Sequence, residues 1–245
     1  MLDRPLSKTA LQQGSQCPRM LWIKYNMGWA TDTSDDERDT TMFEIGDIIG
    51  ASAQEFFNNT VVINTDRGFA PENYAVYADE TAAYMDDPDV ECIAEATFMI
   101  DDVVVFIDLL HRDYDDAGNE VWDIYEVKAS GIVQPHQAQD AVWQTHIALE
   151  CGVPIRATYL MHPGHGTWAF TTDEGEFEVV DMWSNWIARQ AASAETADMI
   201  EYFKEMVACD EPPACECEPG CGECCHAPYQ CNYTNKCREL YDEGR

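Results

Sequence analysis

Apolar residues recur in the first third of the chain at the three- and four-residue spacing of an amphipathic helix. The clearest helix is predicted over 41–57, where the apolar residues of one face are Met42, Ile45, Ile49, Ala53 and Phe56. Shorter helices are predicted over 7–25, with interruptions near Gly14 and Pro18, and over 76–86. The chain therefore begins with helices, and only the short run TVVI among them resembles a strand.

The middle of the chain changes to runs of β-branched and aromatic residues. Three consecutive strands are predicted, with the sequences ECIAEATFMI, VVVFIDLL and VWDIYEVK. The elements expected after them are a helix over 134–151, strands near 155–161, 167–171 and 176–180, and a long helix over 181–207. This order predicts an α/β fold with one central mixed sheet flanked by helices.

The end of the chain loses this periodicity. From Cys209 onward Cys, Pro and Gly dominate, and seven of the 11 cysteines fall between Cys215 and Cys237. Such a segment needs a cross-link or a metal in place of a hydrophobic core. We therefore divide the chain into a domain over 1–208 and a Cys-rich metal-binding segment over 209–245, which is expected to pack back on the N-terminal region.

Composition narrows the setting of the protein. The 245 residues contain no run of eighteen apolar residues and no secretory signal, which predicts a cytoplasmic chain without a membrane span. Cysteines in a reducing compartment favour metal binding over disulfides. The formal net charge of −32 is unusual for a nucleic-acid-binding protein. It is typical of proteins from high-salt habitats, and a basic partner would also explain it.

A carboxylate–lysine constellation lies in the predicted strands. Glu126 and Lys128 are two residues apart, so their side chains project from one face of a strand. A hairpin centred on 115–119 places Asp108 of the preceding strand opposite Glu126. Two carboxylates beside an ammonium group suit Mg²⁺-assisted attack of water on a phosphodiester. An exposed ion pair on a sheet face is the alternative that the isolated motif leaves open.

The surroundings of this constellation resemble the RecB-like branch of the PD-(D/E)xK nucleases. Glu95 in AEATF lies on the strand before Asp108, and a Gln-bearing helix follows the YEVKAS segment. The resemblance covers roughly residues 5–240 and implies a restriction-endonuclease-like core. The helical glutamine of that family corresponds here to Gln139, with Trp143 four residues later, or to Gln144.

The resemblance implies a Mg²⁺- or Mn²⁺-dependent DNA nuclease, either an exonuclease or an endonuclease, acting on single strands or ends. Asp108 and Glu126 would be metal ligands, Glu95 an accessory ligand, and Lys128 would lie beside the attacking water. The chain departs from the family at Gly50, where relatives often carry a metal-binding His. That departure and the negative charge favour an alternative, a non-catalytic scaffold subunit of a DNA repair, recombination or defence complex. A helicase or recombination subunit is a possible protein partner in either case.

The cysteines carry a second part of the resemblance. Iron-dependent members of the family bind a four-iron cluster through one N-terminal and three C-terminal cysteines, and the flanking segments CPRMLW and PYQC are similar here. The corresponding residues are Cys17, Cys225, Cys231 and Cys237. Four thiolates suit a 4Fe–4S cluster, and zinc is the alternative because it accepts the same ligands.

The remaining candidate ligands have weaker signals. CECEPGCGEC contains Cys215, Cys217, Cys221 and Cys224, which form either a second, zinc-like site or an acidic insertion. Cys92 and Cys151 are expected to be small core residues. The two histidines of MHPGHG, His162 and His165, are expected in a turn between strands, and His136 at a solvent-facing helix start.

Overall fold

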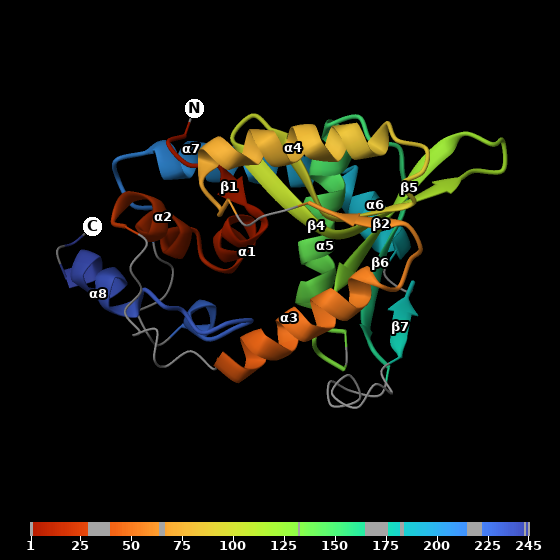
Figure 1. Ribbon diagram of the computed structural model, residues 1–245. Coiled ribbons are helices and arrows are strands. Elements are labelled where there is room, and N and C mark those ends of the chain that lie inside the picture. Colours follow the sequence, from red (N-terminus) through yellow and green to blue (C-terminus); the bar gives the residue numbers. More distant parts are fainter. Residues whose placement is uncertain are drawn as a thin grey trace. The chain divides into compact units, whose positions relative to one another are not determined.

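The computed structural model describes residues 2–28, 40–63, 67–131, 133–164, 176–181, 184–214, 222–242 and 244, with the side chains of 40–43 excepted. Its strands are β1 Leu6–Ser7, β2 Thr60–Val62, β3 Cys92–Ile100, β4 Val103–Tyr114, β5 Glu120–Val127, β6 Ile155–Pro163 and β7 Phe177–Val180 (Figure 1). Its helices are α1 Lys8–Gln16, α2 Pro18–Asn26, α3 Thr40–Gln54, α4 Pro71–Met85, α5 Pro135–Glu150, α6 Ser184–Ala191, α7 Ala194–Ala208 and α8 Thr234–Asp242, with a short 3-10 turn, η3, at Glu223–Cys225.

A mixed sheet organises most of the chain, so the predicted α/β class is confirmed. The strand order is β2-β3-β4-β5-β6-β7, and β1 pairs with β4. The pairs β3/β4, β4/β5 and β6/β7 are antiparallel, whereas β2/β3, β5/β6 and β1/β4 are parallel. The parallel pair β5/β6 is joined by α5, which is the usual way to connect parallel strands.

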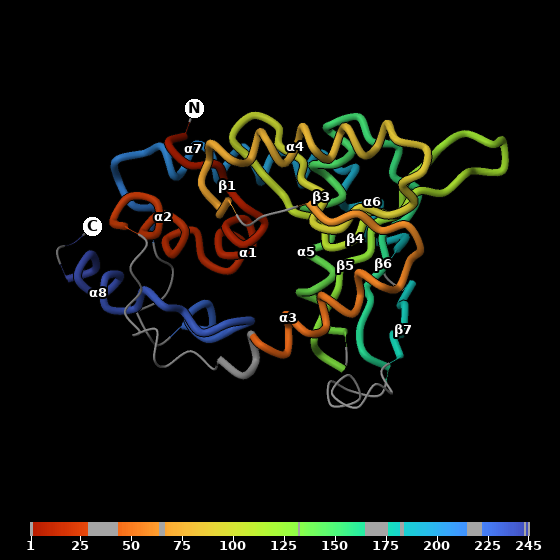
Figure 2. The backbone as a smooth tube through the Cα atoms, viewed as in Figure 1, coloured from red at the N-terminus to blue at the C-terminus, as the bar shows by residue number. Residues whose placement is uncertain are grey.

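The β4–β5 hairpin has the register that the sequence predicts. Leu109 lies opposite Tyr125, and one further step in the same register places Asp108 opposite Glu126. Figure 2 shows β4 and β5 as one long hairpin. The two carboxylates therefore come from neighbouring strands at one level of the sheet.

The turn of the hairpin explains why this register forms. The Asp115 amide donates to the Asn119 carbonyl at 2.9 Å, and the Asp115 carboxylate accepts the Asn119 amide at 2.8 Å. Gly118 has a φ of +80°, a conformation that glycine adopts without strain. The turn residues thus fix the strand pairing locally.

Helices cover both faces of the central strands. On the face that carries Phe106, the rings of Tyr74 and Tyr77 from α4 contact the Phe106 ring, and α5 packs beside them. On the other face Ala53 of α3 packs with Leu109 and with residues of β3 and β6. Because residues 106 and 109 project to opposite sides of β4, the sheet is buried on both faces here.

The long helix predicted over 181–207 is two helices, α6 and α7. The break falls at Ser193, whose hydroxyl accepts the Thr196 amide at 3.3 Å and donates to a carbonyl of the preceding turn. A serine hydroxyl that bonds nearby backbone groups competes with a continuous helix and begins a new one. The apolar periodicity continues across the break, so the pattern alone does not reveal it.

Other expected boundaries also shift. No interruption occurs at Gly14; α1 continues to Gln16, and the break lies at Cys17, just before Pro18. The helix predicted over 76–86 begins earlier, at Pro71, a residue whose fixed φ favours the first position of a helix. The predicted strand over 167–171 lies outside the described residues.

The chain divides into two compact units. One consists of Asp3–Lys8 and Thr40–Thr196, and the other of Thr9–Asp39 and Ala197–Arg245. This division differs from the sequence-based one at residue 208, because the N-terminal helices belong with the C-terminal segment. Within the described residues, no helix is long and apolar enough to cross a membrane.

Candidate functional site

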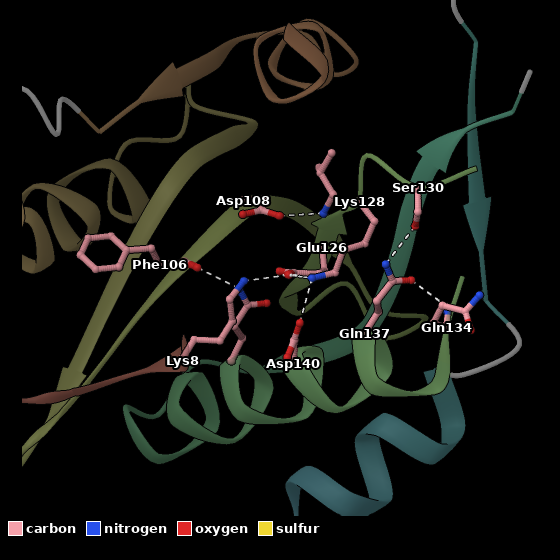
Figure 3. A network of polar contacts seen from close by, with 11 residues as sticks. Lys8, Phe106, Asp108, Glu126, Lys128, Ser130, Gln134, Gln137 and Asp140 are labelled. Atoms are coloured by element: carbon pink, nitrogen blue, oxygen red, sulfur yellow. Dashed lines mark hydrogen bonds and ion pairs between the residues drawn. The ribbon is translucent and has the colours of Figure 1, made fainter. Parts of the chain in front are cut away.

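Glu126 is held between two lysines inside the first unit (Figure 3). Its Oε1 accepts from Lys8 Nζ and from Lys128 Nζ, each at 2.7 Å, and its side chain is only 1% exposed. The second oxygen, Oε2, is buried and has no hydrogen-bond partner among the described residues. A buried carboxylate oxygen without a donor is costly, so this atom is suited to an additional cation or water.

Asp108 faces this pair from β4. One of its oxygens accepts the Val127 amide at 2.7 Å, in the place where a ladder hydrogen bond would otherwise form. Burial, and next the charge of Glu126, raise the pKa of Asp108 to about 7. Burial alone would also raise the pKa of Glu126, but Lys128 and Lys8 hold it at about 2. The two carboxyl groups thus have opposite shifts, and a divalent cation would favour ionisation of Asp108.

Glu95 completes the acidic side of the site. It lies inside β3, yet its φ is +57°, an uncommon conformation for a residue other than glycine. Regular pairing with β4 is interrupted at this level, between Ala94 and Ala96. Burial raises the pKa of Glu95, which Lys8 lowers and Glu126 raises. Strained backbone is concentrated at functional sites, and here it sets the position of a carboxylate.

Helix α5 adds two side chains from one of its faces. Asp140 Oδ2 accepts from Lys128 Nζ at 3.0 Å, and Gln144, one turn later, donates from Nε2 to the Phe106 carbonyl at 2.8 Å. Asp140 Oδ1 and Gln144 Oε1 are buried and have no described partner. Burial raises the pKa of Asp140, whereas its ion pair with Lys128 lowers it. Burial disfavours the charged form of Lys128, but Glu126 and Asp140 raise its pKa above the ordinary value.

A cavity of about 340 Å³ opens beside these residues. Glu95 and Asp108 line it from the sheet, and α3 contributes Asp47, Gly50 and Gln54. A Cβ at Gly50 would meet no described atom within 4 Å, so this position of α3 faces open space. Glu95 and Asp108 bring carboxylates to this cavity, whereas Glu126 and Asp140, which carry the unpartnered oxygens, do not line it. Carboxylate oxygens are the ligands that a hard divalent cation takes.

The structure brings most of the predicted residues together, but not all. Glu95, Asp108, Glu126, Lys128 and Gln144 belong to this network. Gln139 precedes Asp140 and projects about 100° away from it around the helix. Of the two predicted glutamines, only Gln144 contacts β4 among the described hydrogen bonds. His136 lies at the start of α5, partly buried, in agreement with the expected helix start.

The sequence does not predict two residues of the site, Lys8 and Asp140. Lys8 is 118 residues away from Glu126, and no local spacing connects them. Asp140 belongs to a helix with eleven buried residues, so apolar periodicity does not mark its functional face. The available signal for Asp140 was its place on the glutamine-bearing helix, four residues before Gln144.

The cysteines predicted to bind a cluster lie in the second unit. Cys17 is the N-cap of α2, Cys237 lies in α8, and the Cys231 amide donates to the Cys225 carbonyl at 2.9 Å. Burial raises the pKa of the Cys231 thiol, and the neighbouring Cys225 and Cys17 thiols raise it further. The N-terminal cysteine therefore lies close to two C-terminal ones.

Hydrogen bonds hold the two ends of the chain together in this unit. Gln16 Nε2 donates to the carbonyls of Cys224 and Tyr229 at 2.9 and 2.7 Å, and Trp22 Nε1 donates to the Cys209 carbonyl at 2.8 Å. The C-terminal segment thus packs on the N-terminal helices. Of the second cysteine group, Cys224 is described, and Cys215, Cys217 and Cys221 lie outside the described residues.

The other candidate ligands of the sequence have structural positions. Cys92 is buried in β3, as expected, whereas Cys151 is exposed at the end of α5 and not a core residue. His162 is buried in β6, not in a turn, and His165 lies outside the described residues. The strand extends through His162 because its residues pair with β7 as far as Pro163.

A second acidic cluster lies on the opposite face of β4 and β5. Possible ligand atoms of His111, Asp113 and Asp123 lie within 4.8 Å of one another. Arg156 from β6 already binds both aspartates: its Nε donates to Asp123 at 3.0 Å, and its Nη2 donates to Asp123 and to Asp113. This cluster therefore has its own internal cation.

The chain matches no protein-family model, and it matches no curated protein sequence.

Proposed function

We propose that the protein is a divalent-metal-dependent nuclease that hydrolyses phosphodiester bonds in DNA. The observation that carries this proposal is the pair Asp108 and Glu126, which face each other across β4 and β5 beside Lys128, with Asp108 also lining a cavity. The unpartnered Oε2 of Glu126 supports a further ligand at this point. The RecB-like resemblance and the restriction-endonuclease-like core are part of the same proposal.

Each side chain has a defined role in this proposal. Asp108 and Glu126 would hold Mg²⁺ or Mn²⁺, with Glu95 as an accessory ligand at the cavity wall. The metal supplies Lewis-acid activation of water and charge stabilisation at the phosphate. Lys128 stays protonated between Glu126 and Asp140. It would orient the attacking water and stabilise the negative charge that develops on the phosphate. Gln144 fixes α5 against β4 through the Phe106 carbonyl.

Cleavage of end-labelled single- and double-stranded DNA tests the proposal. The parent protein should cleave in Mg²⁺ or Mn²⁺ and lose activity in EDTA. Asp108→Asn and Lys128→Ala should each lower the rate by at least about 10³-fold, the scale of losing a transition-state interaction of about 4 kcal/mol. Asp116→Asn is a matched control, because Asp116 is exposed in the hairpin turn and loses the same charge.

The assay also separates the alternatives. Activity that survives both site substitutions contradicts the residue assignment. An inactive parent across metals, RNA and DNA favours the scaffold role with a protein partner, for which the net charge of −32 is the supporting observation. A salt series from about 0.1 to about 3 M KCl belongs in the assay, because a high-salt protein should be more active toward the upper end, where long-range repulsion from DNA is screened.

We further propose that Cys17, Cys225, Cys231 and Cys237 hold a 4Fe–4S cluster. The proximity of Cys17, Cys225 and Cys231 in one unit supports shared coordination. Anaerobically purified protein should be brown with about four irons per chain, and Cys17→Ser should bleach it, whereas Cys151→Ser, a matched control outside the unit, should not. Colourless protein with one bound zinc would contradict the cluster and favour a tetrahedral zinc site.

A further inference from the structure

Lys8 is anchored at the carboxylate site by the strand that precedes it. β1 pairs with β4 in parallel, with Leu6 opposite Val103, and the Leu6 amide donates to the Asp102 carbonyl at 2.7 Å. Leu6 is fully buried. The two-residue strand therefore fixes the backbone immediately before Lys8, and the 2.7 Å contact with Glu126 follows from that anchorage.

Lys8 and Lys128 share one oxygen of Glu126. Both Nζ atoms lie 2.7 Å from Oε1, and Oε2 has no described partner. Lys128 has a second acid, Asp140, at 3.0 Å. Lys8 also interacts electrostatically with Asp108 and Glu95, so it is a cation common to the three predicted metal ligands.

We propose that Lys8 is a charge-balancing and positioning residue of this site: it neutralises and holds Glu126 through Oε1, and it leaves Oε2 for a divalent cation. This inference rests on the proposed nuclease function. Without Lys8, the buried Glu126 carboxylate keeps one ammonium partner, Lys128, which also pairs with Asp140. With Lys8 the site holds Glu126 in one orientation and restrains the affinity for the metal, because an ammonium group repels a divalent cation nearby.

Two opposite changes are therefore expected in Lys8→Met, which removes the charge but keeps much of the side-chain length. Mn²⁺ should bind about tenfold more tightly, since a nearby positive charge is gone. The cleavage rate at saturating Mn²⁺ should fall about tenfold or more, since Glu126 is less firmly positioned. Lys8→Arg, which keeps the positive charge, should have a Mn²⁺ affinity and a cleavage rate close to those of the parent. If Lys8 only supported the structure of the site, its replacement would weaken Mn²⁺ binding.

The measurement is a titration of the protein with Mn²⁺, followed by the electron paramagnetic resonance signal of the free ion, beside cleavage kinetics at saturating Mn²⁺. Arg4→Met is the matched control, because Arg4 is a cation of the same N-terminal segment and its described hydrogen bond goes to the Phe69 carbonyl. Unchanged or weaker Mn²⁺ binding in Lys8→Met overturns the inference, whether or not the parent cleaves DNA. Tighter binding with an unchanged cleavage rate also overturns the positioning role.

A double-mutant cycle in EDTA tests the charge balance without metal. Lys8→Met should destabilise the parent, because Glu126 loses a partner, and should cost much less in a Glu126→Gln background. The expected coupling is at least about tenfold in the unfolding equilibrium constant. Additive effects would overturn the charge-balancing role whether or not the parent binds Mn²⁺. A parent that binds no Mn²⁺ would overturn the proposed nuclease and the role of Oε2, and the coupling measured in EDTA would still decide the charge-balancing role.

Discussion

Two clusters of acidic side chains lie on opposite faces of the same two strands, β4 and β5, and they are neutralised in different ways. In one, two lysines meet a single oxygen of Glu126, and the other oxygen has no described partner. In the other, the Arg156 guanidinium bonds both oxygens of Asp123 and reaches Asp113 at 2.5 Å.

The difference follows from the shape of the cations. A guanidinium presents several donors in one plane and can satisfy both oxygens of a carboxylate, whereas an ammonium group acts as a compact point charge. The Arg156 cluster is therefore complete as a structural ion pair. The Glu126 cluster is charged and positioned, yet it keeps acceptors for another ligand. Unsatisfied buried carboxylate and amide oxygens, more than acidic residues as such, distinguish the candidate site.

The largest effect on stability is expected at the Arg156 cluster. Arg156→Met should destabilise the protein by about 3 kcal/mol, because Asp123 is 1% exposed and would be buried without its partner. Chemical denaturation measures this change. Asp123→Asn in the same background should recover most of the loss, and Mn²⁺ binding at Glu126 should persist in both variants. Loss of Mn²⁺ binding in Arg156→Met with the fold intact would mean that the two clusters are not independent.

The next largest effect is stabilisation of the folded protein by a metal ion bound at the Glu126 cluster. A ligand that binds only the folded state at about 100 times its Kd stabilises by about 2.7 kcal/mol. Saturating Mn²⁺ should therefore raise the Tm of the parent and of Asp113→Asn, but not of Glu126→Gln. Thermal denaturation with and without EDTA measures it. A Tm shift abolished by Asp113→Asn and retained by Glu126→Gln would reverse the roles of the two clusters.

The sequence predicts those parts of the site that depend on local structure. The register of Asp108 and Glu126 follows from the turn at 115–119, and the spacing of Glu126 and Lys128 follows from the geometry of one strand. Both relations span few residues, so strand periodicity and turn chemistry determine them. The α/β class is predictable for the same reason, because each strand and helix has its own periodicity.

The remaining parts depend on tertiary packing. Lys8 reaches Glu126 because β1 pairs with β4, and a two-residue strand leaves almost no periodic signal. The choice between Gln139 and Gln144 depends on the rotational position of α5, which is buried nearly all round. The unusual φ of Glu95 has no sequence signature either, since that residue occurs in an otherwise regular strand pattern.

A smaller effect is expected at Gln144. Gln144→Met removes the hydrogen bond to the Phe106 carbonyl, which costs about 1 kcal/mol, and it also removes the unpartnered Oε1, which offsets much of that cost. The free energy of unfolding in EDTA should therefore change by less than about 1 kcal/mol. Cleavage should fall if Oε1 serves the site, and Gln139→Met is the matched control on the same helix. Equal cleavage rates for the two variants would exclude Gln144 from the mechanism.

The smallest expected effect is a pH dependence of the free energy of unfolding, which arises from His111 in the Arg156 cluster. His111 stacks on the Phe57 ring with centroids 4.2 Å apart, and its Nδ1 is buried without a described partner. Burial lowers the pKa of His111 below its ordinary value of 6.5; Asp113, Asp123 and Glu91 raise it, and Arg156 lowers it. These carboxylates do not overcome burial, in agreement with a cluster that Arg156 already neutralises.

The sign of the effect follows from proton binding. Below pH 6.5 the unfolded chain binds a proton at His111 that the folded protein does not yet bind, so the free energy of unfolding falls as pH decreases through this range. His111→Gln should remove this contribution, and its stability relative to the parent should rise from pH 7.5 to pH 5.5, values on the order of one unit either side of an ordinary histidine pKa. Denaturation of both proteins across this range measures the difference, in which the titration of the other groups cancels. A relative stability that falls instead would show that the aspartates hold His111 protonated, and that Arg156 does not neutralise this cluster.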